Sequence, residues 1–484
     1  MAKFRLNNGR HNSLYMLLPL VAFFLLLVFI ALIIPSLSTV KTIAFIFGII
    51  LFIASFASTE AALYILIFSM LLSPEFIVGA TGGASLGRGV TIRADDFLIM
   101  IIGLSWLARM SINKELGLFL KTPLNKPIAF YILLCLVSTL FGSLFGRVNF
   151  KTGFFFVLKY FEYVIVYFMV VNHLKTEKQV IRFTWAILIT CTIVSLIGIS
   201  QIPMGGRVSA PFEGASGEPN TLGGYLVFII CVTTGLLLTS RSLRDKLIFS
   251  GLALLFFIPL LYTQSRSSYI AIIPAMISFL FLSEKKIIVL SSIFFAGLIF
   301  LFLTPDVAKK RINYTFIQGQ NRADVVEVGG IKLDTSTSDR IKSWYAASKD
   351  WMKEPLLGYG VTGYRFVDAQ YIRVLVETGV IGLLAFLLLV RTIYKMAYKN
   401  FLAAHTSFNR GLAMGFIAGF TGLLFHALGA NTFIIVRIME PFWFVTGIVV
   451  LISQVEDKEQ PGYIEKGKEK QKPTGRDRIT FLSR

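Results

Sequence analysis

The amino-acid sequence predicts an all-α protein whose helices cross a membrane many times. Its 484 residues are 55% hydrophobic and only 15% charged, and the mean hydropathy is +0.72. Soluble domains carry about 25% charged residues, so a chain this apolar requires a bilayer around it. Long apolar runs, such as SLYMLLPLVAFFLLLVFIALIIPS, reach the roughly 20 residues that a helix needs to cross the hydrocarbon core.

Apolar segments recur along the chain and predict a polytopic bundle of about 12–14 transmembrane helices. We place these segments at 14–36, 40–57, 61–79, 96–111, 126–145, 154–174, 181–201, 220–239, 246–263, 269–283, 286–304, 375–396, 411–430 and 434–453. The first run follows basic residues, but it is too long for a signal peptide and lacks a small-residue cleavage pattern. We therefore expect it to remain as a helix.

The positions of lysine and arginine predict the orientation of the bundle. Basic loops such as KTEKQVIR, SRSLRDK and RTIYKMAYKN fall on one side together with both termini, and the positive-inside rule assigns that side to the cytoplasm. The net charge of +20 then reflects topology and contact with anionic membrane lipids, and it gives no reason to expect nucleic acid. We expect a multi-pass membrane protein whose two termini lie in the cytoplasm.

This topology divides the chain into four parts. They are an N-terminal transmembrane bundle of about 11 spans (1–304), a large extracytoplasmic loop (305–374), about three C-terminal spans (375–453) and a basic, disordered cytoplasmic tail (454–484). The loop holds nearly all of the extracytoplasmic polar sequence, so we expect the chemistry there. Within it, STSDRIKSWYAASKDWMKEP predicts a short amphipathic helix that begins at Ser338 or Asp339, ends before Pro355 and carries Trp344 on a membrane-facing aromatic side.

No pattern for a metal or a cofactor is present. The three cysteines lie inside predicted spans without paired spacing, and none of the four histidines has a second ligand nearby in the sequence. We favour a packed or water-facing role for His426 over catalysis. Charged residues inside the spans are expected to pair: Lys159 with Glu162 and Arg437 with Glu440. At an outer helix end, Asp95 and Asp96 are expected to cap the helix, with Arg93 as their charge partner.

Four motifs in a fixed order carry a resemblance to a known family. GEPNTLGGYL, YTQSRSSYIAI, DRIKSWYAASKDWMKEPLLGYGVTGYRF and DAQYIRVLVETGVIGLL, between about residues 200 and 395, resemble the bacterial O-antigen ligase and O-antigen polymerase superfamily. These are polytopic, GT-C-like glycosyltransferases. The resemblance implies a donor glycan on undecaprenyl pyrophosphate, which is transferred to an acceptor hydroxyl at the outer face of the membrane without a nucleotide sugar, metal or cofactor.

The resemblance also implies roles for three residues. Arg266 and Arg340 match the two arginines that look like a pyrophosphate clamp in the family, and a guanidinium suits the growing charge on a phosphate leaving group. The alternatives are a membrane-interface anchor for Arg266 and a surface helix charge for Arg340. Asp368 is the candidate general base or orienting residue. Ligases of the superfamily have a histidine and an asparagine where this chain has Asp368 and Ala369, and a helix N-cap is the equal alternative for Asp368.

Further candidates for substrate binding lie on the same outer side. They are Gln370, Tyr371, Arg365, Trp344, Lys309, Lys310, Arg311, Asn220 and Glu377. Seven of them also have a structural alternative: packing for Gln370 and Tyr371, binding of lipid phosphates for Lys309, Lys310 and Arg311, a helix cap for Asn220, and for Glu377 a favoured contact between the loop and a basic residue.

We favour a polymerase that joins lipid-linked repeats into a capsule, exopolysaccharide, O-antigen or teichuronic-type polymer, because the His-Asn pair of the ligases is absent. A ligase that transfers the glycan to a lipid A core is the first alternative. A flippase or transporter is the second, although no internal repeat supports it. The expected partners are the lipid-linked donor, the glycan acceptor and membrane lipids, and the prediction leaves flippase and chain-length regulator proteins open.

Overall fold

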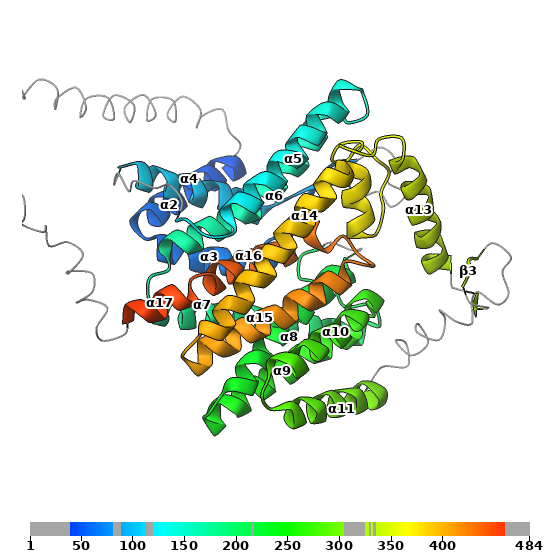
Figure 1. Cartoon of the computed structure of the whole chain (residues 1–484). Helices are drawn as coiled ribbons and strands as arrows, with labels where there is room; N and C mark the ends of the chain where they lie inside the picture. Colours follow the sequence, from blue (N-terminus) through cyan, green and yellow to red (C-terminus); the bar gives the residue numbers. More distant parts are fainter. Residues whose placement is uncertain are drawn as a thin grey trace, which may run out of the picture.

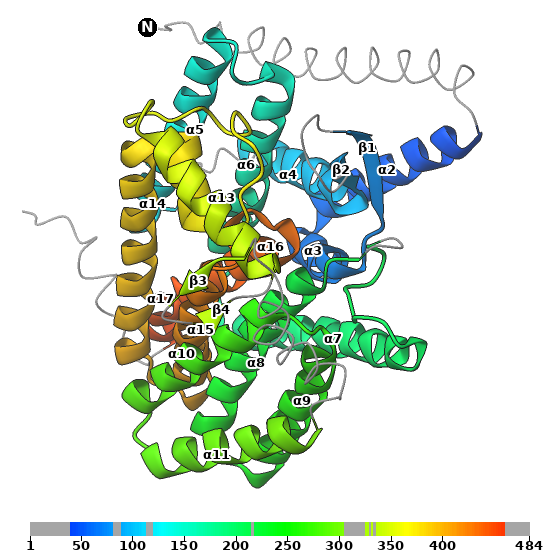
Figure 2. The same cartoon turned by 90° about the vertical axis from the view of Figure 1, so that its right-hand side faces the viewer.

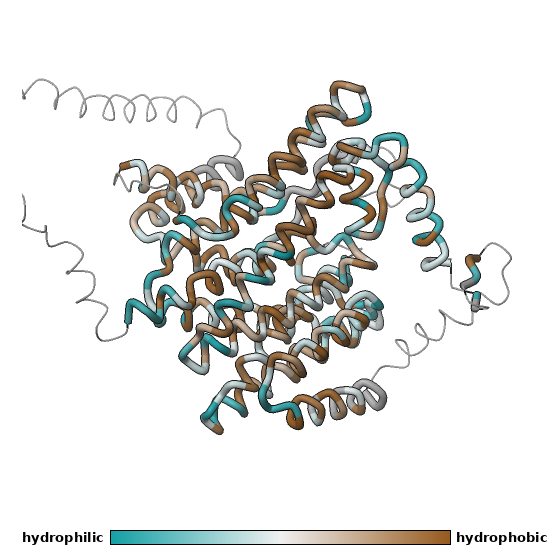
Figure 3. Tube along the Cα trace, viewed as in Figure 1, coloured by the Kyte–Doolittle hydropathy of each residue, from teal (hydrophilic) through white to brown (hydrophobic). Residues whose placement is uncertain are grey.

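The fold was obtained as a computed structural model, and it describes residues 39–80, 89–112, 120–213, 217–303, 325–328, 331–332 and 335–459. Figure 1 shows a bundle of helices with short irregular connections. The all-α, polytopic fold class is confirmed, since eight helices in the described ranges are long and apolar enough to cross a membrane. Figure 3 shows apolar residues along these helices, whereas α13 is largely polar.

The helices follow one another along almost the whole described chain. In order, they are α2 (Thr39–Ala57), α3 (Thr59–Leu72), α4 (Ala94–Ile112), α5 (Asn125–Leu144), α6 (Phe150–His173), α7 (Glu177–Gln201), α8 (Pro219–Thr239), α9 (Leu243–Tyr262), α10 (Arg266–Leu282), α11 (Lys286–Leu303), α13 (Thr335–Trp351), α14 (Gln370–Ala403), α15 (Ser407–His426), α16 (Val436–Val449) and α17 (Ile452–Glu459). Two 3-10 turns, η2 (Ile202–Met204) and η4 (Thr432–Ile434), precede α8 and α16. Two antiparallel hairpins pair β1 (Glu75–Ala80) with β2 (Gly89–Arg93) and β3 (Glu327–Val328) with β4 (Ile331–Lys332).

The predicted spans lie on these helices, with one correction. The span predicted at 14–36 lies outside the described residues, and thirteen others each fall mainly on helix. The span predicted at 61–79 is wrong at its end, because α3 stops at Leu72 and the chain continues into β1. Pro74 explains this difference, since a proline excludes the helical conformation from the residue before it.

Helices α8 and α15 form the closely packed centre of the bundle. Gly411, Gly415 and Gly419 recur every four residues on one side of α15 and face α8. A Cβ atom on Gly415 would lie 2.6 Å from the carbonyl oxygen of Cys231, and one on Gly235 would lie 2.3 Å from that of Gly411. Small residues at such spacing let two membrane helices approach backbone to backbone.

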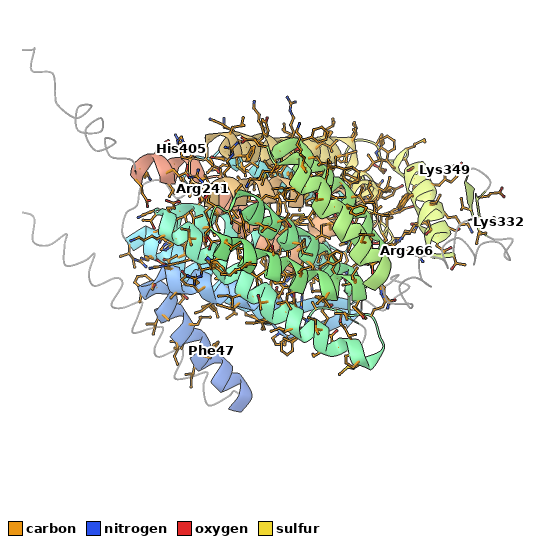
Figure 4. The ribbon with its side chains drawn as sticks, turned by 90° about the horizontal axis from the view of Figure 1, so that it is seen from below. Phe47, Arg241, Arg266, Lys332, Lys349 and His405 are labelled. Atoms are coloured by element: carbon orange, nitrogen blue, oxygen red, sulfur yellow. The ribbon has the colours of Figure 1, made fainter. Side chains whose placement is uncertain are left out.

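The two ends of the bundle differ. In Figure 2, α13 lies across one end, in front of α16. Figure 4 places Arg266, Lys332 and Lys349 toward that end, whereas Arg241 and His405 lie at the opposite end. We call the first of these the α13 end.

Candidate functional site

An ion pair between α13 and the start of α14 lies at the centre of the α13 end. Arg340 donates from Nη2 to Oδ2 of Asp368 over 2.7 Å, and their side chains are 27% and 29% exposed. A guanidinium has five N–H donors. Within the described residues, Asp368 is the one hydrogen-bond partner of Arg340, so most of its donors have no hydrogen-bond partner there.

Helix α13 begins at Thr335, so the predicted start at Ser338 or Asp339 is wrong by about one turn. The hydroxyl of Ser338 does not serve as a start signal. It accepts a hydrogen bond from the amide of Val326 over 2.9 Å and so ties α13 to the segment that enters β3.

The capping alternative for Asp368 is also wrong. Helix α14 begins at Gln370, and Ala369 occupies the N-cap position without a side-chain capping bond. Asp368 therefore lies one residue too early to cap the helix, and Arg340 engages its carboxylate instead.

Arg266 reaches the same helix from α10. Ser265 caps α10 by accepting from the amide of Ser268 over 3.3 Å, which places Arg266 in the first helical position. Nη1 of Arg266 lies 3.4 Å from the hydroxyl of Thr337, one turn before Arg340 on α13. The two arginines, 74 positions apart in the sequence, thus converge on one face of α13.

The turn that follows α15 contains Gly429 and packs against the side chains of Ser267 and Arg340. A Cβ atom on Gly429 would lie 2.5 Å from Oγ of Ser267 and 3.8 Å from Nη1 of Arg340. Only a glycine leaves room for these side chains to approach the turn so closely. The sequence motifs did not identify Ser267, Thr337 or this turn as part of the site. The sequence signal nearest to them is the pair Ser265–Arg266 within YTQSRSSYIAI.

Hydrogen bonds fix the same turn to the beginning of α14. Asn431 donates from Nδ2 to the carbonyl of Val367 over 2.9 Å, and the amide of Phe433 donates to Oε1 of Gln370 over 3.1 Å. Gln370 is 1% exposed, and the hydroxyl of Tyr371 donates to the carbonyl of Leu424 over 2.7 Å. Both side chains therefore contact the protein's own main chain in this structure.

His426, the last residue of α15, is packed between the turn that follows α15 and helix α8. Its Nδ1 lies 2.8 Å from the hydroxyl of Thr432, and the side chain is fully buried. A Cβ atom on Gly224 of α8 would lie 3.1 Å from Cε1 of the ring. These contacts agree with the packed role that the sequence predicts for His426.

Two motifs of the sequence, PLLGYG and ETGVIG, form one contact. The amide of Gly360 donates to the carbonyl of Glu377 over 2.8 Å. Gly379 interrupts α14 with φ 68° and ψ −172°, and a Cβ atom there would lie 2.1 Å from the carbonyl oxygen of Leu356. This backbone conformation is essentially confined to glycine, which explains the glycine of ETG.

Glu377 fixes the same contact through its side chain. Its Oε1 accepts from Nε of Arg373 over 3.0 Å and from the amide of Thr362 over 3.1 Å. The hydroxyl of Ser138 on α5 donates to the main-chain carbonyl of Glu377 over 2.7 Å. Glu377 thus ties the loop to Arg373, and it is buried beneath the surface of the loop.

A second network holds the end of α13. Asp350 accepts from Nζ of Lys353 over 2.8 Å and from the hydroxyl of Tyr364 over 2.6 Å. These hydrogen bonds, the one from Lys353 first, lower the pKa of Asp350. The exposed guanidinium of Arg365 lies 5.4 Å from the ring centre of Tyr364.

The remaining predicted residues are spread more widely. Asn220 lies in the first turn of α8, where Glu218 holds the N-cap position, so the capping alternative for Asn220 is wrong. Trp344 packs against the buried side chains of Val367 and Ala369 at the start of α14, so this ring contacts protein. Lys309, Lys310 and Arg311 lie outside the described residues.

The comparison with protein families agrees with this arrangement. Residues 251–387 match the family model described as O-antigen ligase. The match runs from α9 to the middle of α14, and it includes Arg266, Arg340 and Asp368. No curated protein matches the chain. The resemblance found in the sequence motifs is thus confirmed for residues 251–387 of this multi-pass membrane protein.

Proposed function

We propose that the protein is a polysaccharide polymerase at the outer face of the bacterial cytoplasmic membrane. It transfers a glycan from undecaprenyl pyrophosphate to the next lipid-linked repeat. The convergence of Arg266 and Arg340 on one face of α13, beside the carboxylate of Asp368, is the observation that carries this proposal.

The two arginines suit a pyrophosphate. Most N–H donors of Arg340 have no hydrogen-bond partner among the described residues, and a guanidinium binds two phosphate oxygens at once. Helices α8 and α10 are neighbours at this end, because a Cβ atom on Gly223 would lie 2.2 Å from the hydroxyl of Ser268. Both helices begin here, and the positive ends of their dipoles add to the attraction of an anion.

The transfer is a displacement at the anomeric carbon. The acceptor hydroxyl oxygen forms the new glycosidic bond, while the bond from that carbon to the pyrophosphate oxygen breaks and its electron pair leaves with the pyrophosphate. Arg266 and Arg340 stabilise the charge that grows on this oxygen. The proton of the acceptor hydroxyl passes to the carboxylate of Asp368. Because Asp368 binds Arg340 in the free protein, the pyrophosphate first competes with it for the guanidinium and thereby releases the carboxylate.

The acceptor distinguishes the two candidate reactions. A carboxylate at position 368, in place of the histidine of the ligases, favours the polymerase. The ligase is the second candidate, because the matching family model is described as O-antigen ligase.

The test uses purified protein in nanodiscs with lipid-linked repeats extracted from cells that lack it. We expect a ladder of longer glycans and released undecaprenyl pyrophosphate without added nucleotide sugar. Arg340→Lys should lose at least about tenfold in rate, because lysine keeps the charge but cannot bind two oxygens. Asp368→Asn should lose roughly 10²-fold. Lys349→Gln, an exposed change on the same helix, is the matched control and should leave the rate unchanged.

Two results would contradict the proposal. If undecaprenyl pyrophosphate is released only when a lipid A core saccharide is added, the protein is a ligase. If no polyprenyl-linked glycan is consumed with either acceptor, the transfer itself is wrong.

A further inference from the structure

A group of buried charges connects three helices and β2 beside the proposed transfer site. We call it the ion cluster; its members are Arg93 on β2, Asp95 and Asp96 on α4, Lys159 and Glu162 on α6, and Glu440 on α16. Asp95 and Glu440 are fully buried, and the other side chains are at most 14% exposed. Nothing in the proposed transfer reaction uses these residues.

The contacts divide the ion cluster into two groups. Nη2 of Arg93 lies 2.6 Å from Oδ2 of Asp95 and 3.5 Å from Oε1 of Glu440. Nζ of Lys159 contacts Oδ2 of Asp96 and lies 3.2 Å from Oε2 of Glu162.

The expected pair between Arg437 and Glu440 is wrong, because both side chains bind other elements. Arg437 donates to the carbonyl of Pro211 over 2.7 Å and lies 3.9 Å from the carboxylate of Glu213, which balances its charge. Glu440 instead contacts Arg93.

The charges of the ion cluster do not balance. Four carboxyl groups face two cations, so two negative charges are in excess when every group is ionised. An uncompensated charge inside an apolar bundle costs several kcal/mol. Two positive charges from outside the chain are therefore needed to compensate this excess.

Asp96 and Glu162 indicate which ion can supply these charges. Their carboxyl groups share the ammonium group of Lys159. In the described structure, Oδ1 of Asp96 and Oε1 of Glu162 are buried without a hydrogen-bond partner. An ionised carboxylate can only accept hydrogen bonds, whereas a protonated carboxyl group carries no charge and can also donate one.

We propose that the ion cluster is a proton-binding site, in which one proton is shared by Asp96 and Glu162 and a second is held by Asp95 and Glu440 around Arg93. Oε2 of Glu440 is buried without a hydrogen-bond partner within the described residues, so no donor would stabilise a negative charge on this oxygen. Among these residues, no three histidine, cysteine or acidic side chains are arranged to hold a metal ion, which favours protons over a cation.

Proton binding at this place is coupled to the α13 end. Tyr163, next to Glu162, donates from its hydroxyl to the carbonyl of Phe433 over 3.2 Å. The amide of Phe433 binds Gln370 at the start of α14. Loss of the protons at alkaline pH leaves uncompensated charges between α4, α6 and α16, and so loosens the turn that supports Asp368. Since the folded protein binds these protons more tightly than the unfolded chain, stability falls as pH rises.

The decisive experiment measures protonated carboxyl groups directly in the wild-type protein in nanodiscs. Infrared difference spectra between neutral and alkaline pH should show the carbonyl stretch of protonated carboxyl groups at neutral pH, and its loss on titration. Exposed carboxylates are already ionised at neutral pH and do not contribute. A spectrum without this band at neutral pH would refute the proposal whether or not the protein transfers glycans.

A variant assigns the band to the ion cluster. In Glu162→Gln, the amide donates to Asp96 as the protonated carboxyl does, so the protein should keep its melting temperature at pH 6 and lose less of it by pH 9 than the wild type. The band should also weaken. Glu284→Gln, at an 85% exposed side chain, is the control and should change neither. A wild-type pH profile in Glu162→Gln, or a melting temperature that follows sodium concentration instead of pH, would overturn the assignment.

Discussion

Replacing Gly379 by alanine should damage both stability and transfer, although this residue touches no substrate in the proposed reaction. The backbone at Gly379 has φ 68° and ψ −172°, a conformation that costs another residue about 1–3 kcal/mol. The new methyl group would also lie 2.1 Å from the carbonyl oxygen of Leu356, whereas an ordinary contact begins near 3.4 Å. Relief of this overlap costs about 1–3 kcal/mol more.

The geometric effect reaches the proposed site through the loop. The PLLGYG turn has to move by more than an ångström, and this turn lies between α13 with Arg340 and the segment with Asp368. A displacement of about 1 Å at reacting groups can cost 10²-fold in rate. We therefore expect a loss of about 2–6 kcal/mol in the free energy of unfolding, together with a transfer rate reduced by roughly 10²-fold.

The assay combines denaturant unfolding in detergent with the glycan-transfer assay in nanodiscs. Gly251→Ala in α9 is the matched control, because no atom lies within 4 Å of the position that its Cβ would take. That variant should keep full activity and be slightly more stable, since alanine favours a helix over glycine by up to about 1 kcal/mol. A Gly379→Ala protein that matches the wild type in both measurements would refute the role given to the ETG motif.

Three further predictions concern the packing around the site. Gly415→Leu should lower the melting temperature strongly by forcing α15 away from α8, while Gly251→Leu should not. Ser138→Ala should cost about 0.5–1.5 kcal/mol in unfolding free energy, because the carbonyl of Glu377 loses one of its two buried hydrogen bonds and keeps the one from Gly360; an unchanged stability would contradict this role. The lowered pKa of Asp350 means that its contribution to loop order is present above the ordinary value of 3.8 and disappears as pH falls through the lower folded value. The protection factors for hydrogen exchange over residues 350–364 should therefore fall on acidification, and Asp350→Asn should already show low protection at neutral pH.

The sequence was sufficient for the fold class because membrane helices are specified by length and apolarity, which are local properties. It failed where a local signal competed with the apolar pattern. The apolar run from 61 to 79 continues through Pro74, but the proline ends the helix and the remainder becomes β1. The start of α13 was placed too late because Ser338 resembles a cap, whereas its hydroxyl binds Val326.

The candidate site was predictable as a set of residues, and its contacts were not. Motif order was sufficient to select Arg266, Arg340 and Asp368, but nothing in the sequence indicates that Arg340 binds Asp368 or that Arg266 reaches Thr337. These contacts depend on how α10, α13 and α14 meet in space. The error at Glu440 has the same origin: spacing on one helix favours a pair, but a cation from another element lies closer.

The departure from the ligases at position 368 changes the order of events in the proposed reaction. A neutral histidine has no negative charge with which to form an ion pair with a guanidinium, so it can accept a proton before any substrate binds. Asp368 is held by Arg340 over 2.7 Å in the free protein, so its carboxylate is occupied by the guanidinium before any substrate binds. The donor pyrophosphate competes for that same guanidinium. Its binding to Arg266 and Arg340 therefore also releases the carboxylate of Asp368. The acceptor hydroxyl is therefore activated only after the donor is in place, which protects the protein from deprotonating an acceptor that has no glycan to receive.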